Sequence, residues 1–250
     1  MIVLRDEARI ARLRRVSQLL SLVGFLALVV GLIMAFLDPA RYFIYQLVAL
    51  LAGWVMSQIG VSLGHRYVRR PRPDEVLDKE VKPAAKDGRM YHYLLPAPHV
   101  LLTPHGVILF VAKFQSGVIS VDNDKWRQRG IGLRRFFGGE SLGNPTREAQ
   151  MLVGALANYI RKHAPEVEEV PIAPVIVFTS LGTQELEIGE TSVPVVHFKK
   201  LKGFLRQQRG KGRQPELSAA DYAALKRAFD EKASHLLEQR TDELDEAMGA

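Results

Sequence analysis

The stretch Leu94–Gly117, LLPAPHVLLTPHGVILFVAKFQSG, decides the fold of this chain. Residues 107–113 alternate as a half-buried β-strand does, and they place Val111 and Lys113 on the same face. With the apolar segment before it, this strand predicts a short β-meander. A lysine that ends an apolar strand can carry its ammonium to water along its aliphatic stem, or it can belong to a site. The strand alone leaves both interpretations of Lys113 open.

The segments on either side of the meander follow a recognisable order. A helix-like segment containing RPDEVL comes first, NPTREAQ opens a long helix after the meander, and the apolar segments PVIVF and VPVVHF come last. Together with LTPHGVILFVAKFQSG, these pieces resemble the nuclease-related domain (NERD) family, a branch of the PD-(D/E)xK nuclease-like fold. The resemblance spans roughly Pro73 to Arg206. It implies an α/β domain in which helices flank a mixed sheet.

The resemblance also implies where the family's metal site would lie. In the family, an aspartate on one strand and a Glu-x-Lys on the next bind a divalent metal and position the attacking water. Here these acidic positions fall at Pro98 and Val111, and only Lys113 is retained, so the nuclease motif is degenerate. Two further matches to the family are Glu75 on the first helix and Gln150 near the start of the second.

The meander contains no Asp or Glu. Mg²⁺ requires hard oxygen ligands, usually at least one or two carboxylates, and without a metal no bound water is activated. The sequence therefore predicts a non-catalytic domain with no metal and no cofactor. The alternative is a metal-dependent nuclease with a relocated site, in which Mg²⁺ would be held near Lys113 and Gln150 by carboxylates from Glu75, Asp122 or Asp124.

Composition sets further limits. The chain has 250 residues, a formal charge of +7 and no cysteine, which excludes disulfides and thiolate metal sites. Its length suggests one domain with additions rather than two full domains. His99 and His105 flank the missing aspartate, but two histidines without a third ligand make a poor zinc site.

Two uncharged runs near the N-terminus are each long enough to cross a membrane as a helix. They are Val16–Leu37 and Tyr42–Gly64, separated by the polar break DPAR. We interpret them as a two-helix transmembrane hairpin. The predicted organisation is a basic segment at 1–15, expected to be a helical lead-in, the hairpin at 16–64, a basic linker at 65–73, the NERD-like domain at 74–207, and a basic linker with a C-terminal helix at 208–250.

Charges at the hairpin ends predict its orientation. Arginines cluster before the first run and after the second, while the connecting turn carries one arginine and one aspartate. The positive-inside rule then places the N-terminus and the soluble domain in the cytoplasm of a multi-pass protein of the cell membrane. The two alternatives are a cleaved signal peptide at the first run and a buried helical hairpin of a soluble protein.

Basic residues suggest the partners. Arg134 and Arg135 stand beside two phenylalanines in a glycine-rich insert, and a second basic cluster follows the last strand. Both patterns are typical of surfaces that bind nucleic acid or anionic lipid head groups. The candidate residues for nucleic-acid binding are Lys113, Arg134, Arg135, Lys199, Lys200 and Lys202.

The last helical pattern begins near Leu217 and places one apolar stripe along its length. That stripe could cover the domain or bind a protein partner. Taken together, the sequence predicts a membrane-anchored, non-catalytic nuclease-like domain that binds nucleic acid or acts as a scaffold. The alternatives are the relocated nuclease described above and a protein-interaction platform that does not bind nucleic acid.

Overall fold

The computed structural model forms two compact units. One combines Met1–Asp6 with nearly all described residues from Pro73 onward, and the other contains Glu7–Arg72. We refer to them as the sheet domain and the helical hairpin. The structure describes residues 1–130, 132, 141–210, 217–234 and 236–238.

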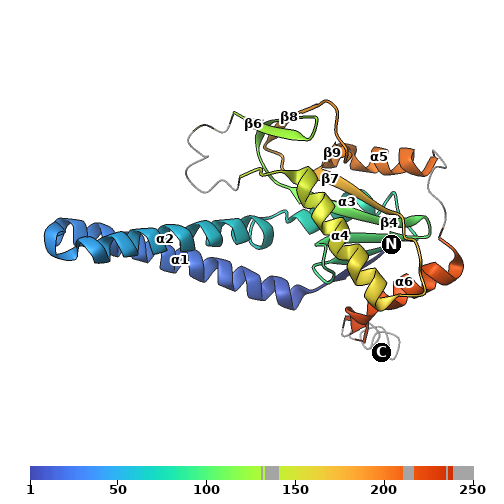
Figure 1. Cartoon of the computed structure of the whole chain (residues 1–250), viewed down its shortest axis with the longest axis horizontal. Coiled ribbons are helices and arrows are strands. Elements are labelled where there is room, and N and C mark those ends of the chain that lie inside the picture. Colours follow the sequence, from blue (N-terminus) through green and yellow to red (C-terminus); the bar gives the residue numbers. More distant parts are fainter. Residues whose placement is uncertain (131, 133–140, 211–216, 235, 239–250) are drawn as a thin grey trace, which may run out of the picture. The chain divides into compact units, whose positions relative to one another are not determined.

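The described chain contains six helices and nine strands (Figure 1). The helices are α1 (Glu7–Leu37), α2 (Pro39–Tyr67), α3 (Pro73–Val81), α4 (Pro145–His163), α5 (Phe198–Gly210) and α6 (Ala219–Glu231). The strands are β1 (Ile2–Arg5), β2 (Arg89–His92), β3 (His99–Thr103), β4 (Gly106–Lys113), β5 (Gly117–Asp122), β6 (Lys125–Arg129), β7 (Ile172–Phe178), β8 (Thr183–Ile188) and β9 (Val195–His197).

The main sheet has the strand order β1-β2-β3-β4-β7-β9. Strands β2, β3 and β4 are antiparallel neighbours, which is the predicted meander, and β4 then pairs in parallel with β7. Strand β9 lies at one edge of this sheet, and Pro194, which cannot donate a ladder hydrogen bond, stands directly before it. The expected α/β class, a mixed sheet flanked by helices, is therefore confirmed.

Both faces of the main sheet are covered, because β4 and β7 carry apolar side chains on both sides. Leu109 and Val111 pack in a core with residues of α4 and α6, such as Phe229. Phe110 packs in a second core with residues of α3 and α5, such as Leu77. Lys113 follows Val111 by two residues and so belongs to the α4 side of the sheet.

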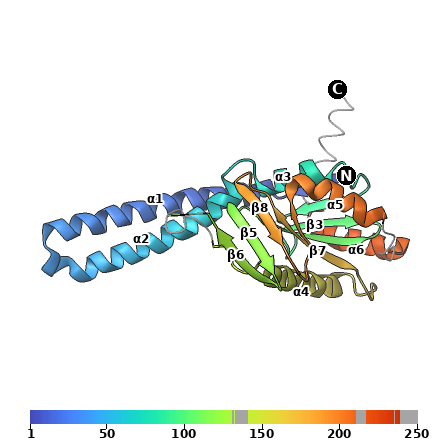
Figure 2. The ribbon, with the colours of Figure 1, turned by 90° about the horizontal axis from the view of Figure 1, so that it is seen from above.

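A second, smaller sheet has the order β6-β5-β8 (Figure 2). Strand β5 pairs antiparallel with β6 through the turn at Asn123 and Asp124, both of which have positive φ angles. It pairs in parallel with β8 on its other side. These strands continue directly from β4 and β7, so they extend the sheet domain beyond the end of the strand that carries Lys113.

The first residues of the chain differ from the sequence prediction. A helical lead-in was expected, but Ile2–Arg5 forms strand β1, which pairs in parallel with β2. Asp74 lies inside α3, fully buried, with its carboxylate 2.8 Å from the Arg5 Nε. Local pattern misled here because β1 is fixed by partners more than 80 residues away.

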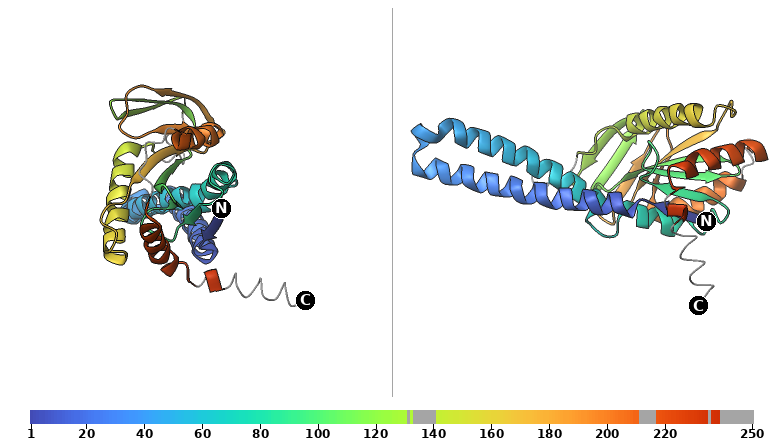
Figure 3. Two further views of the ribbon diagram at one scale, coloured as in Figure 1. Left: turned by 90° about the vertical axis from the view of Figure 1, so that its right-hand side faces the viewer. Right: turned by 90° about the horizontal axis from the view of Figure 1, so that it is seen from below.

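The helical hairpin joins two antiparallel helices at a polar turn (Figure 3). Asp38 caps α2 by accepting a hydrogen bond of 3.1 Å from the Arg41 backbone N–H. Both helices are long and apolar enough to cross a membrane, and only 11% of each apolar window is buried. Most core helices of soluble proteins are largely buried, so this exposure argues against the buried-hairpin alternative.

Helix α6 packs on the sheet domain. Its residues Leu225, Ala228 and Phe229 are buried in the α4-side core, and the Tyr159 hydroxyl of α4 donates to the Ala228 carbonyl at 2.9 Å. Ser218 caps the start of α6, close to the Leu217 at which the sequence pattern begins. The apolar stripe of α6 is therefore used inside the domain, and the protein-partner role proposed for it stays a prediction.

Candidate functional site

Lys113 ends strand β4 on the α4 side of the sheet. Its side chain is buried, with the residue only 6% exposed, and its ammonium forms an ion pair with the Glu148 carboxylate. Its backbone carbonyl accepts hydrogen bonds from the Thr179 N–H at 2.7 Å and from the Thr179 hydroxyl at 3.2 Å. The lysine therefore does not extend to water at the strand end; a carboxylate from another element holds it.

Glu148 is positioned by the first turn of α4. Asn144 caps this helix, accepting from the Arg147 N–H at 3.0 Å, and Pro145 occupies the first helical position. The partial positive charge of a helix N-terminus stabilises a carboxylate in its first turn. Glu148 thus contacts one full and one partial positive charge, while its side chain stays 37% exposed.

The sequence analysis selected Gln150 on this helix and missed Glu148. Residues two apart on an α-helix point about 200° away from each other, so they cannot face the same strand end. The structure places Gln150 on the exposed side of α4, away from Lys113. The sequence did contain a signal for this ion pair. The Asn144-Pro145 cap places Glu148 in the first turn of a helix, and Lys113 at the end of a strand is a cation that such a glutamate can pair with.

The two positions where the family carries acidic residues lie across from each other. Strands β3 and β4 pair Val100 with Leu109, and the same register continued places Pro98 opposite Val111. The Pro98 carbonyl accepts from the Tyr93 N–H at 2.8 Å, and Val111 is buried in the apolar core. Apolar side chains thus occupy the two positions that would bind a metal.

The carboxylates of the relocated-site alternative are distributed around the domain. Glu75 is on α3, which covers the opposite face of the sheet from α4. Asp122 accepts from the Glu190 N–H at 3.1 Å, at the far end of β5. Within the described residues, no three His, Cys, Asp or Glu side chains gather closely enough to hold a metal ion.

Asp124 joins the second sheet to the start of α4. Its Oδ1 accepts hydrogen bonds of 3.1 Å from the Thr146 hydroxyl, the Thr191 hydroxyl and the Ser192 N–H. The bonds from Ser192, followed by those from Thr191 and Thr146, lower the pKa of the Asp124 carboxyl. The Trp126 indole N–H also donates to Thr146, at 2.9 Å. These hydrogen bonds give Asp124 a structural role, because they connect the turn between β5 and β6 to the start of α4 and to the residues after β8.

The two histidines near the missing aspartate have different surroundings. His105 lies in the turn between β3 and β4, as the sequence indicated. His99 is buried, with its Nδ1 2.8 Å from the Nδ1 of buried His92, and the His92 Nε2 is 2.9 Å from Asp78. In the Nδ1–Nδ1 contact one nitrogen donates and the other accepts, so this pair forms a hydrogen-bonded network that reaches Arg5 through Asp78.

Helix α5 carries the basic candidates that the structure describes. Lys199 and Lys200 are exposed, Lys202 is half-buried, and Leu201 and Leu205 attach the opposite face of the helix to the sheet. Lys199, Lys202 and Arg206 follow the i, i+3, i+7 spacing and share one face, which we call the basic stripe. Arg134 and Arg135 lie outside the described residues.

The start of α5 is electrostatically positive. Its first turn contains Lys199 and Lys200 and no acidic residue, although a helix N-terminus disfavours cations. Burial, followed by the neighbouring lysines, lowers the pKa of His197 against the raising effect of the Ser180 carbonyl. Gly203 in the stripe has no atom within 4 Å of the position a Cβ would take, so the surface between the cations is open.

The comparisons with known proteins give one match. The family model described as Nuclease-related domain, NERD, matches residues 90–179. No curated protein and no solved structure matches the chain. The matched range runs from β2 to the end of β7 and includes Lys113, Glu148 and Gln150, whereas Glu75, the helical hairpin and α5 lie outside it.

Proposed function

The chain contains a nuclease-related domain at residues 90–179, and from this premise we propose that it is a membrane-anchored, non-catalytic protein that binds nucleic acid at the cytoplasmic face. The observation that carries the proposal is the pairing of Lys113 with Glu148 beside a buried valine. Glu148 pairs with the ammonium of the retained Lys113, at a site where Pro98 and Val111 stand in place of the family's two acidic residues.

Loss of catalysis follows from the charges around Lys113. A metal-dependent nuclease needs carboxylates to hold the ion and a free cation to stabilise the developing negative charge. Here Glu148 neutralises the Lys113 ammonium, and Pro98 and Val111 offer no oxygen side chain. The domain therefore keeps the fold of a nuclease and uses its surface rather than its former active site.

Membrane anchoring and orientation are supported by the connectivity of the chain. Strand β1 precedes the helical hairpin and α3 follows it, yet both belong to the sheet domain. Both ends of the hairpin are therefore joined directly to segments of the sheet domain. Cleavage of α1 as a signal peptide would remove β1 and leave buried Asp74 without Arg5. The arginines at both ends favour the cytoplasmic side.

Nucleic-acid binding is assigned to the basic stripe on α5. Three cations on one helical face concentrate positive charge along a line, and the Lys200 ammonium at the start of α5 adds to their field. Contacts of this kind are independent of sequence and depend steeply on salt. With three phosphates contacted, we expect a slope of log K against log salt of about −2.7 on duplex DNA.

The test uses the full chain in detergent or nanodiscs with 3′-labelled single- and double-stranded DNA, across a salt series with Mg²⁺ or Mn²⁺ present. The double variant Lys199→Ala/Lys202→Ala should make the slope shallower by about 1.8. The matched control is Arg161→Ala/Lys162→Ala, which removes two exposed cations from the end of α4. Equal loss in both variants would assign the binding to general surface charge rather than to the basic stripe, whereas binding insensitive to salt would favour the protein-interaction platform.

A second function is favoured by the exposure of Glu148. Its carboxylate touches Lys113 and is open to solvent, so it is the described acidic group that could begin a relocated Mg²⁺ site. In that case the same assay would show metal-dependent cleavage that is lost in Glu148→Gln and in Lys113→Ala. Absence of cleavage with intact DNA binding would support the non-catalytic proposal.

A further inference from the structure

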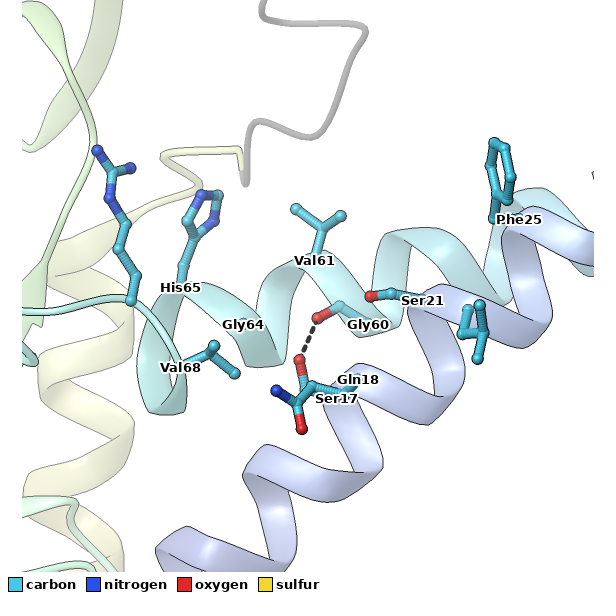
Figure 4. Close-up of a pocket in the computed structure, with 11 residues that line it drawn as sticks. Ser17, Gln18, Ser21, Phe25, Gly60, Val61, Gly64, His65 and Val68 are labelled. Atoms are coloured by element: carbon cyan, nitrogen blue, oxygen red, sulfur yellow. Dashed lines mark hydrogen bonds between the residues drawn. The ribbon is translucent and has the colours of Figure 1, made fainter.

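A groove of ≈ 630 Å³ lies along the helical hairpin (Figure 4). Its floor is made by small residues of both helices, and the Ser17 hydroxyl of α1 donates to the Gly60 carbonyl of α2 at 2.8 Å. The groove is shallow and widely open to its surroundings. The residues that line the groove are all part of the hairpin itself.

The close approach of the two helices creates this groove. A Cβ added at Gly60 would lie 2.7 Å from the Ser21 backbone nitrogen, so the helices meet with almost no side chain between them. Larger side chains on either side then rise above this floor. Leu22 and Phe25 of α1 are exposed beside it, and Val61 of α2 stands on the other side of Gly60 from the contact (Figure 4).

The chemistry of the groove changes along its length. One end contains Gln18, His65 and Arg69, and the other end contains the apolar Leu22 and Phe25. Eight residues of helix correspond to about 12 Å, which is the distance from the level of a head group to well inside the hydrocarbon. The polar end coincides with the residues at which both uncharged runs meet their basic flanks.

We propose that this groove binds one anionic glycerophospholipid. Arg69 contacts the head-group phosphate, the Ser21 hydroxyl meets an ester carbonyl, and one acyl chain lies against Leu22 and Phe25. The occupant must be anionic at one end, apolar at the other and present in the bilayer, and a phospholipid has all three properties. The proposal rests on the membrane insertion proposed above.

The local electrostatics favour an anion at this end. The C-terminus of α2 carries a partial negative charge, which alone would repel a phosphate. Arg66, Arg69 and Arg70 follow one another at that terminus and outweigh it, and each arginine near a membrane surface contributes about 1 kcal/mol of attraction to anionic lipid. A lipid in the groove would therefore be held by contacts with the groove wall as well as by charge, whereas other lipids near the arginines would be held by charge alone.

The experiment is native mass spectrometry of the full chain released from nanodiscs that contain phosphatidylglycerol and phosphatidylcholine. The wild-type chain should retain one phosphatidylglycerol in preference to phosphatidylcholine. Arg69→Ala should weaken this retention about tenfold, and Val61→Trp, which fills the groove without changing charge, should abolish it. The matched controls are Arg70→Ala and Val55→Trp, which alter residues that do not line the groove, and both should retain the lipid.

Three outcomes would overturn the proposal. Retention in Val61→Trp would show that the groove is not the site, and equal losses in Arg69→Ala and Arg70→Ala would reduce the effect to general surface charge. Displacement of the lipid by excess inorganic phosphate would identify a phosphate ion as the occupant. Extraction of the wild-type chain by an alkaline carbonate wash is measured separately, because release would contradict membrane insertion itself.

Discussion

The helical hairpin and the sheet domain distribute large and small side chains in opposite ways. In the sheet domain Phe110 and Phe229 are fully buried. In the two uncharged runs of the hairpin the buried residues are small, such as Gly24 and Gly31, while Phe36 is 81% exposed. Burial of apolar area stabilises a protein in water, whereas helices in lipid associate through close packing of small residues. The hairpin therefore has the distribution of side chains that helix packing in lipid favours, and the sheet domain has that of a core formed in water.

The largest expected effect compares two phenylalanines. Phe110→Ala removes a side chain that is 0% exposed and should lower the free energy of unfolding of the sheet domain by about 3–5 kcal/mol. Phe36→Ala removes one that is 81% exposed and should leave it unchanged. Denaturant unfolding of both variants in the same detergent measures the difference. Similar losses in the two variants would mean that Phe36 is buried in the folded protein.

The second prediction breaks the connection between β1 and α3. Arg5→Ala leaves the Asp74 carboxylate buried without its ion pair, and removal of one partner of such a pair costs about 3–5 kcal/mol. The control is Arg227→Ala, whose ion pair with Glu166 is solvent-exposed and contributes about 0–1 kcal/mol. Equal effects would contradict the burial of Asp74. For the same reason, the assays above use the full chain rather than a fragment that begins at α3.

The third prediction separates the two helices of the hairpin. A Cβ at Gly24 would lie 2.7 Å from the Ser57 backbone nitrogen, so Gly24→Leu should cost about 1–3 kcal/mol or more of hairpin stability. The chain has no cysteine, so a Ser17→Cys/Gly64→Cys pair can report helix contact by disulfide formation. Gly24→Leu should strongly reduce this disulfide. Ala52→Leu, on the exposed side of α2, should not reduce it.

The smallest expected effect is a difference between the two regions in how their stability depends on pH. The pKa of Asp124 is lowered in the folded protein, so its contribution is present above the unfolded pKa of about 3.8 and is lost as pH falls through the folded pKa. Asp124→Asn should therefore lower domain stability by about 1 kcal/mol at pH 7 and by less below pH 4. A disulfide formed beforehand at neutral pH in the Ser17→Cys/Gly64→Cys variant should not follow this trend, because it joins the uncharged runs of the hairpin. A difference that stays constant with pH would contradict the assignment.

Much of the fold could be predicted because its signals are local. The meander, the edge strand β9 and the helix starts at Asn144 and Ser218 depend on alternation, proline and capping residues within a few positions. The long uncharged runs likewise predicted α1 and α2. Strand β1 was missed because three apolar residues carry no sign of whether they continue a helix or pair with a distant strand.

In the candidate site, too, local signals could be predicted from the sequence and contacts between distant residues could not. Lys113 was identified by its place on a strand, and Pro98 and Val111 by alignment with a family pattern. Glu148 was not identified as its partner, because the approach of α4 to the end of β4 is a contact between residues 35 positions apart. Gln150 resembled a family residue, but helix geometry turns it to solvent.

The sequence by itself determined the two long apolar helices, most strands and caps of the sheet domain, and the absence of acidic residues at Pro98 and Val111. These properties depend on composition and on neighbours within one or two turns of chain. Only the tertiary structure decided that β1 completes the sheet, that Glu148 neutralises Lys113, and that small residues of α1 and α2 leave a groove between them. Each of these is a contact between distant segments, and its geometry exists only after the chain has folded.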